Sequence, residues 1–445
     1  MKKLAFAALA AMFVLAACAP GSSGSRPVNR QAGDVKKDVA AMGQVTLTIW
    51  DQEVRGGQEK QITTLNEQFQ RRYPNVRLNR VPRSFDDLRS TLKLGLTGND
   101  APDVVQVNNG KQDMGAFVKA GLLLPLNGFA RAYGWERRFP EPVWRLATYP
   151  DTGDVLGEGN LYGVPQTGEL VGIYYNKTIL AKLGLQPPKT WGEFDATLAK
   201  AKAAGVLPIQ LGNLDKSAAP HLFTLGMHRF GGPDEQLGLA TGRPGASWKT
   251  EANRMAAQQL LDWVGRSYLT PGFAGLKGDD SAAKFTKGEG LFHVDGTWLM
   301  PDLRSSMHDS VGFLLPPPQS NGEVSVTGGT GIPWAIGAKT KNPDAAAAYL
   351  DFITSAEAMK VQAENGGLPV FDVAGQPATG LQREVFDGWL KASSSNAMIP
   401  YLDYATNDAY EVVTGGVEQL MSGQLTLNGF LDKLQADLDA SHGGR

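Results

Sequence analysis

Hydrophobic and polar residues alternate along the chain in a rhythm of short strands and amphipathic helices. Residues 45–50 are apolar and β-branched, which is typical of a strand, and apolar residues then recur at helical spacing over 62–69. Further strand and helix patterns follow in turn at 76–81, 85–96, 103–107 and 114–120. This order predicts an α/β fold, with a mainly parallel sheet covered by helices on both faces.

The same alternation returns in the second part of the chain. Thr190 stands three residues before Glu193, a capping-box spacing that predicts the start of a helix reaching Ala204. Strands are expected at 170–175, 207–211 and 290–294, and helices at 177–183, 253–264, 343–354, from 357 onward and over 405–438. Two α/β runs are therefore expected.

The N-terminal residues have the pattern of an export signal. Two lysines precede an apolar stretch at 4–14 that is too short to span a bilayer, and residues 1–17 fit a signal peptide. Leu-Ala-Ala-Cys at 15–18 resembles the lipobox of bacterial lipoproteins, which implies cleavage before Cys18 and acylation of its thiol, for example with palmitate. A plain signal peptide with a chance cysteine is the alternative. The small, polar residues within 18–43 predict a flexible tether.

Composition narrows the possible functions. The chain has 445 residues and a net charge of −2, which argues against nucleic-acid binding. Its single cysteine excludes an internal disulfide and a cysteine-based zinc site. The sequence contains no phosphate-binding loop, no dinucleotide fingerprint, no G-x-S-x-G elbow and no H-E-x-x-H motif, and its five histidines are scattered. We therefore expect no cofactor and no metal.

Several segments together resemble the extracellular solute-binding proteins of ABC sugar importers, the maltodextrin-binding-like family. They follow the family order at 101–105, 120–126, 161–165, 174–177, 188–194, 296–298, 327–331, 341–346 and 366–369. The resemblance implies a periplasmic-binding-protein-like fold, in which two α/β lobes are joined by three chain crossings with the ligand between them. The implied lobes are 44–163 plus 327–370 and 164–326 plus 371–445.

Sugar chemistry and the resemblance together suggest a binding site. Sugars need planar hydrogen-bonding groups and aromatic rings against their apolar faces. Ligands of parallel sheets lie beyond the carboxyl ends of strands. In the first lobe, the expected ligand-binding residues are Trp50, Asp51, Glu53, Arg55, Asn108, Asn109 and Gln112. By family position, the resemblance adds Glu169, His221, Trp298, Gly329, Gly331 and Tyr410, with Tyr404 as the alternative to Tyr410.

These features predict reversible capture of a carbohydrate without catalysis. The closed form is expected to dock on an ABC permease that is powered by a separate ATPase. We expect a monomer, exported and held by lipid on the outer face of the cytoplasmic membrane. Two alternatives remain open: the same fold with a peptide, polyamine or metal chelate as its cargo, and a lipid-anchored glycosidase with two carboxylates flanking the cleft.

Overall fold

The first sheet has the strand order β11-β3-β1-β2. β1 (Val45–Asp51) pairs in parallel with β2 (Val76–Pro82) and β3 (Val104–Gln106), while β11 (Trp334–Ile336) is antiparallel at the edge. The predicted parallel core of this sheet is therefore confirmed. The computed structural model describes residues 27–139 and 141–443, so the expected signal peptide 1–17 and Cys18 lie outside the described residues.

Helices cover this sheet, and local sequence explains where they begin. α1 (Gly56–Arg72) follows β1, and α2 (Phe85–Thr97) follows β2. Ser84 caps α2 by accepting a hydrogen bond from the Asp87 amide at 3.1 Å. The other helices and short strands up to the second sheet are α3 (Ala116–Lys119), α4 (Asn127–Tyr133), α5 (Trp135–Arg138), α6 (Glu141–Trp144), β4 (Thr148–Tyr149) and β5 (Asn160–Leu161).

The second sheet has the order β12-β10-β6-β8-β7, with β9 also pairing with β6. The central strand β6 (Gly168–Asn176) is antiparallel to β8 (Phe292–Gly296), β9 (Val311–Leu314) and β10 (Val326–Thr330). In the described part of the chain, the parallel pairs of this sheet are β7 (Ile209–Gln210) on β8 and β12 (Met398–Ile399) on β10. The second sheet is therefore mixed, with antiparallel pairs around β6 and parallel pairs toward its edges.

Helices surround the second sheet and complete the fold. Thr190 caps α8 as predicted, with its hydroxyl accepting from the Glu193 amide at 3.2 Å. The helices of this part and of the return to the first sheet are α7 (Lys177–Lys182), α8 (Trp191–Ala203), α9 (Ala219–Phe230), α10 (Pro233–Thr241), α11 (Glu251–Gly265), α12 (Gly278–Thr286), α13 (Met300–Met307), α14 (Pro343–Ile353), α15 (Ala356–Glu364), α16 (Gly380–Ser394), α17 (Ala409–Met421) and α18 (Leu427–His442).

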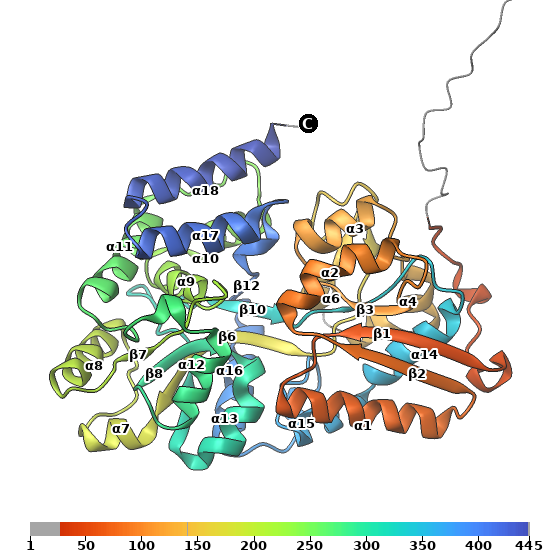
Figure 1. The fold of residues 1–445 in the computed structure, drawn as a ribbon, viewed down its shortest axis with the longest axis horizontal. Coiled ribbons are helices and arrows are strands. Elements are labelled where there is room, and N and C mark those ends of the chain that lie inside the picture. The colour runs from red at the N-terminus through yellow and green to blue at the C-terminus, as the bar shows by residue number, and fades with distance from the viewer. Residues whose placement is uncertain (1–26, 140, 444–445) are drawn as a thin grey trace, which may run out of the picture.

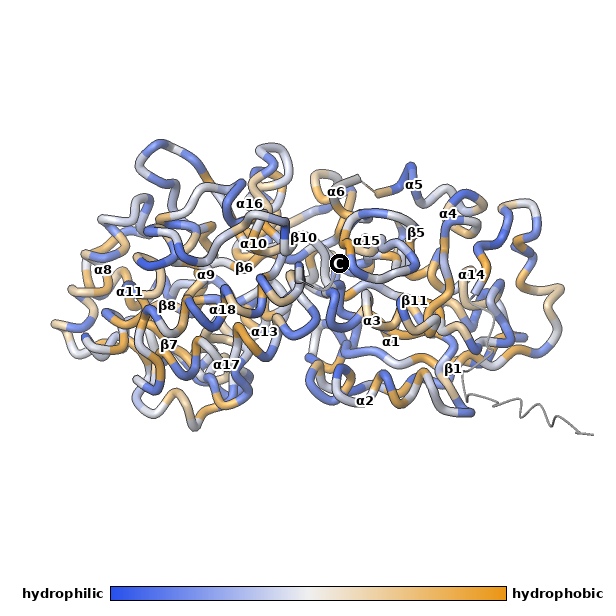
Figure 2. Tube along the Cα trace, turned by 90° about the horizontal axis from the view of Figure 1, so that it is seen from above, coloured by the Kyte–Doolittle hydropathy of each residue, from blue (hydrophilic) through white to orange (hydrophobic). Residues whose placement is uncertain are grey.

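Two lobes lie side by side, each built on one of the sheets (Figure 1). We call them the first and second lobe. Apolar residues gather inside each of them (Figure 2), and separate buried clusters form the two cores. Among the described residues, no helix is both long and apolar enough to cross a membrane.

The chain passes between the lobes near 164–167, at 331–333 and near 369. Val164 bridges Trp334 of the first sheet, and Thr167 bridges Pro369. The expected boundary at 327 is wrong, because all of β10 pairs with strands of the second sheet. The crossing therefore comes after Thr330, in the short link to β11.

The expected flexible tether is also wrong for residues 27–43, which we call the N-terminal strap. Val39 is only 1% exposed and belongs to the core of the first lobe. The Arg30 guanidinium lies 2.8 Å from the Asp344 carboxylate, and the Asn75 side chain donates to the carbonyls of Val39 and Gly43. A few anchoring side chains in a small, polar stretch thus hold the strap against the lobe.

Candidate ligand-binding cleft

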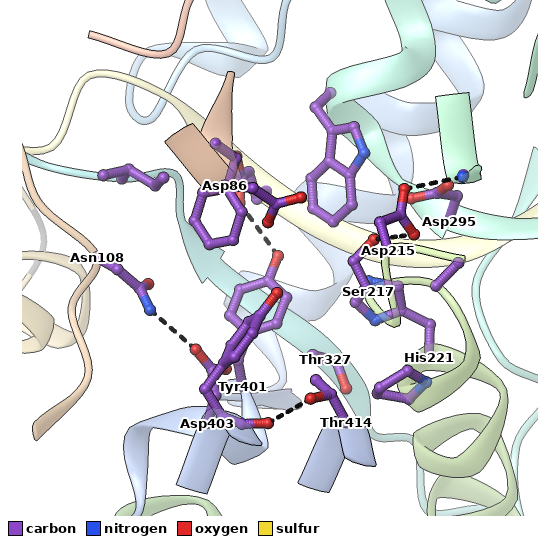
Figure 3. A pocket seen from close by; sticks show the side chains of 18 of the residues that line it. Asp86, Asn108, Asp215, Ser217, His221, Asp295, Thr327, Tyr401, Asp403 and Thr414 are labelled. Atoms are coloured by element: carbon purple, nitrogen blue, oxygen red, sulfur yellow. Dashed lines mark hydrogen bonds between the residues drawn. The ribbon is translucent and has the colours of Figure 1, made fainter. Parts of the chain in front are cut away.

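A cavity of ≈ 230 Å³ lies between the two lobes. Figure 3 shows side chains of both lobes around it, Asp86 and Asn108 from the first and Asp215 and His221 from the second. Its lining combines carboxyl, amide and hydroxyl groups with aromatic rings. The lining residues are Gln52, Arg55, Ser84, Phe85, Asp86, Asn108, Glu169, Asp215, Ser217, Ala218, Pro220, His221, Thr224, Gly278, Asp279, Asp295, Trp298, Thr327, Thr330, Ile332, Tyr401, Leu402, Asp403, Tyr404, Tyr410, Val413 and Thr414.

The wall from the first lobe is made by segments that follow its parallel strands. Gln52 and Arg55 come after β1, Asp86 opens α2 after β2, and Asn108 comes after β3. The carboxyl ends of these three strands meet at one edge of the sheet, where the α/β rule places ligand. The cleft therefore follows from the topology of the first sheet.

The wall from the second lobe centres on the antiparallel strands and on the start of α9. Glu169 lies on β6, and Trp298 follows β8 directly. The ring centroids of His221 and Trp298 are 5.7 Å apart, and the His221 ring lies 6.3 Å from that of Tyr401. Burial lowers the pKa of His221, so its imidazole is neutral at pH 7. Together these rings give the cleft flat apolar faces.

A short segment before α17 completes the cavity. The Tyr401 hydroxyl donates to the Glu169 carboxyl at 3.1 Å. Asp403 accepts a hydrogen bond from the Asn108 amide of the first lobe at 2.9 Å (Figure 3). Burial raises the pKa of Asp403 to about 6, against the opposing hydrogen bond from Asn108. The lobes are thus already in polar contact across the cavity.

Two buried glutamates lie close enough to affect each other's pKa: Glu169 on the cleft wall and Glu53 inside the first lobe. Burial raises the pKa of Glu169 to about 7, and the nearby Glu53 carboxyl adds to this shift. Burial also raises the pKa of Glu53 to about 7, although the Gln106 amide donates to it at 2.7 Å. Near pH 7 each glutamate is therefore divided between its protonated and ionised forms.

Further contacts join the lobes beside the cavity. Arg89 of α2 contacts Asp113 of its own lobe at 3.2 Å and Glu411 of α17 at 3.0 Å. Its guanidinium lies 3.8 Å from the centre of the Tyr410 ring. These contacts hold α17 against the first lobe.

The structure brings six of the expected site residues to the cavity wall. These are Arg55, Asn108, Glu169, His221, Trp298 and Tyr410, and the alternative Tyr404 lines the cavity as well.

Three expected residues of the first strand-end loop lie inside the first lobe instead. Asp51 is 0% exposed and pairs with Arg80 through both carboxylate oxygens at 2.7 Å. Glu53 is buried against Gln106. The Trp50 ring packs against Gly95, so closely that a Cβ added to Gly95 would lie 2.4 Å from the ring. The Arg83 guanidinium covers the face of the Trp50 ring, 4.0 Å from its centre. These side chains shape the loop rather than line the cavity.

Asn109 and Gln112 lie behind the cavity wall. Asn109 is fully buried, donates to the Leu146 carbonyl at 2.7 Å and accepts from the Tyr404 hydroxyl at 3.1 Å. Gln112 hydrogen-bonds to the Glu411 side chain and accepts from the backbone amide of Tyr410 at 3.3 Å. Both residues position lining segments of the second lobe.

Gly329 and Gly331 also lie off the wall, and each leaves room for a protein side chain. A Cβ on Gly329 would lie 2.8 Å from Leu146, and Gly329 has a φ of +140°. A Cβ on Gly331 would lie 2.9 Å from a Glu169 carboxylate oxygen. These glycines let other side chains pack closely where a backbone approach to ligand was expected.

Several lining residues were missed by the sequence analysis. Asp86 follows the second parallel strand, so the strand-end rule that selected Asn108 would have found it. Asp215, Asp279, Tyr401 and Asp403 come from loops and helix starts of the second lobe, where no local pattern marks them.

A cleft between two α/β lobes, lined by polar groups and aromatic rings from both, defines a two-lobe solute-binding protein. The sequence profile of the bacterial extracellular solute-binding protein family matches residues 56–360. The chain belongs to this family.

Individual relatives agree with this assignment. A multiple sugar-binding protein of Streptococcus mutans is 23% identical over 394 residues, which cover 83% of this chain and 86% of that protein. Among solved structures, a chitin oligosaccharide binding protein is 25% identical with a TM-score of 0.77, covering 90% of this chain and all of that one. RafE in complex with raffinose is 20% identical with a TM-score of 0.72, covering 89% of this chain and all of RafE, and supports the fold alone.

Proposed function

We propose that the protein captures a carbohydrate reversibly between its lobes and delivers it to the permease of an ABC transporter, which a separate ATPase powers. The observation that carries this proposal is the lining of the cleft. Trp298, Tyr401 and Tyr404 offer ring faces beside the carboxyl and amide groups of Glu169 and Asn108. Pyranose rings present apolar faces and a rim of hydroxyls, which these two kinds of group complement.

Closure of the lobes would couple binding to delivery. The wall residues come from both lobes, and Asn108 already reaches Asp403 across the cavity. A ligand that touches both walls favours the closed arrangement through contacts that an open form lacks. A permease that recognises the closed arrangement would then receive loaded protein. The three crossings between the sheets are the proposed hinge.

The relatives support a carbohydrate as the solute. One is named a multiple sugar-binding protein, and a structural neighbour is named for chitin oligosaccharide. The family and these neighbours are solute-binding proteins rather than enzymes. We accordingly propose capture with no bond made or broken, in place of the glycosidase alternative.

Calorimetric titration with a panel of mono- and oligosaccharides, combined with analysis of each sugar after incubation, tests this function. Saturable binding of an unchanged sugar is expected. Sugar turnover would favour the glycosidase, and binding of a peptide or metal chelate but no sugar would favour another cargo.

We further propose that the exported chain is a monomer anchored to the outer face of the cytoplasmic membrane through lipid on Cys18. The lipobox-like 15–18 segment supports this placement. Cys18→Ser should abolish labelling by a palmitate analogue and release the protein from the membrane fraction. Unchanged labelling and fractionation would contradict the anchor.

A further inference from the structure

The wall of the cleft carries far more negative than positive charge. Six carboxyl groups line the cavity, those of Asp86, Glu169, Asp215, Asp279, Asp295 and Asp403. Arg55 is the single Lys or Arg among the lining residues, and its guanidinium is already 3.1 Å from Asp279. With every carboxyl ionised, the lining would have a formal charge of −5; Glu169, with a pKa of about 7, carries only part of its charge at pH 7, and the other carboxyls still outnumber Arg55. His221 adds no positive charge, because burial lowers its pKa.

Two hydroxyl groups on the wall have no hydrogen-bond partner among the described residues. The Thr330 hydroxyl is buried at 2% exposure, lines the cavity and has no hydrogen-bond partner among the described residues. The buried hydroxyl of Tyr410 has none within the same part of the chain. Unpaired buried polar atoms are costly, so these atoms indicate a polar ligand inside the cavity.

Asp86 and Asp215 are on opposite sides of this cavity, one from each lobe (Figure 3). Asp215 accepts from the Gly278 amide at 2.9 Å and from the Ser217 hydroxyl at 3.1 Å. Among the described residues, no hydrogen bond or ion pair reaches the Asp86 carboxylate. Both carboxylates line the same cavity, and within the described part of the chain neither forms an ion pair with a cationic side chain.

Neutral hydroxyls would not offset this charge. A hydroxyl donates one hydrogen bond but brings no countercharge, whereas an ammonium group donates three and carries a full positive charge. Carboxylates removed from water gain most from a partner that is itself charged. No group of three or more potential metal ligands gathers within the described residues, so these carboxyls are not arranged around a metal ion.

Resting on the proposed function, we infer that the carbohydrate bound here is an amino sugar, whose protonated amine lies between Asp86 and Asp215. Such a ligand keeps the ring faces that Trp298 and Tyr401 would cover. Its ammonium group bridges the two lobes and therefore strengthens their closure. A polyamine would satisfy the charge but would leave the aromatic faces without a flat partner.

The raised pKa of Asp86 agrees with its position facing Asp215 across the cavity. Its pKa is raised, first by burial and then by the facing Asp215 carboxylate, with smaller contributions in the same direction from Asp87 and Asp279. Arg89 opposes the shift. A cation bound between Asp86 and Asp215 would reverse it, so binding should release protons to the buffer near the titration range of Asp86.

Matched sugars test the inference. The chain from residue 19 onward is titrated by calorimetry with glucosamine, N-acetylglucosamine and glucose, which carry an amine, an acetamide and a hydroxyl at the same carbon. The titration is repeated with β-1,4-linked disaccharides that carry the same three groups. At pH 7 and low salt, the amine form should bind at least about tenfold more tightly than either neutral form. High salt should reduce this ratio.

Two variants test whether the amine binds at Asp86. Asp86→Asn should lower the ratio of amine to neutral affinity about tenfold. Asp100→Asn, which removes the same charge from an exposed position outside the cavity, should leave the ratio unchanged.

The outcomes separate this inference from the proposed function. Neutral sugars that bind as tightly as their amine counterparts would overturn the amino-sugar inference and leave carbohydrate capture standing. An unchanged ratio in Asp86→Asn would overturn the assigned position of the amine. Binding of spermidine but of no sugar, by a folded sample, would overturn both the inference and the proposed function.

Discussion

The stability of the protein should fall as the pH rises from about 4.5 to 7, and Glu169→Gln should remove part of that fall. Glu169 is only 7% exposed, and burial, reinforced by Glu53, raises the pKa of its carboxyl from 4.5 to about 7. The Tyr401 hydroxyl and the Arg55 guanidinium oppose this shift without cancelling it. Glutamine keeps the shape and the hydrogen-bonding oxygen of the protonated acid but cannot ionise.

The direction in which stability changes with pH follows from proton binding. Between pH 4.5 and 7 the folded protein keeps a proton on Glu169 that the unfolded chain releases. Stability is therefore highest below the unfolded pKa and is lost as the pH rises toward the folded pKa. One pKa unit corresponds to about 1.4 kcal/mol, so the shift from 4.5 to about 7 corresponds to on the order of 3 kcal/mol. Glu53 should contribute a similar loss.

Urea unfolding at pH 5, 6, 7 and 8 measures this dependence. Glu169→Gln should lose less stability than the wild type over this range and should be the more stable protein at pH 8. Glu158→Gln, an exchange at an exposed glutamate, should keep the wild-type slope. If Glu169→Gln keeps the full slope, or loses the same stability at every pH, the reasoning about a buried protonated acid is refuted.

Three further substitutions test the site and its supports. Trp298→Ala should weaken carbohydrate binding about tenfold in calorimetry, since the substitution removes a ring face from the cleft wall. Asp51→Asn should lower the free energy of unfolding by about 3–5 kcal/mol in urea, because Arg80 keeps a buried charge without its main partner. Glu411→Gln should weaken ligand binding only a few-fold at low salt, because its contact with Arg89 is partly exposed and worth about 0.2–1 kcal/mol.

Each of these substitutions has a result that would contradict the account. For Trp298 the control is Trp144→Ala, at a half-buried tryptophan outside the cavity, and equal losses of affinity would contradict a stacking role. Asp51→Asn with full stability but lost binding would restore the aspartate as a direct ligand contact. If Glu411→Gln changes binding equally at high and low salt, its ion pair does not contribute to closure.

The helices and strands could be predicted from the sequence because apolar patterns and helix caps depend on neighbouring residues. The apolar pattern of 45–50 and the Thr190 cap each depend on neighbouring residues, and the structure has β1 and α8 there. Pairing between distant strands is not local. The antiparallel partners of β6 and the membership of β10 in the second sheet depend on how the chain crosses between the lobes.

The site was predictable where topology alone brings residues together. The ends of β1 and β3 meet at one edge, so Arg55 and Asn108 lie on the cavity wall where they were expected, and their contact with ligand stays a prediction. Asp51 was misplaced because its partner Arg80 lies on the adjacent strand, where Arg80 is paired in register with Ile49, and only the folded sheet shows that ion pair. Tyr401 was missed because its link to the cleft is a hydrogen bond to Glu169, 232 residues away in the chain.

Carbohydrate capture is tested most directly by following the thermal unfolding of the chain from residue 19 onward across a panel of sugars. A sugar at about a thousand times its dissociation constant should stabilise the folded state by about 4 kcal/mol. We expect a clear, saturable rise in melting temperature with at least one carbohydrate, and a smaller rise in Trp298→Ala at the same concentration. A folded sample whose melting temperature responds to no sugar, while it responds to a peptide, a polyamine or a metal chelate, would contradict it.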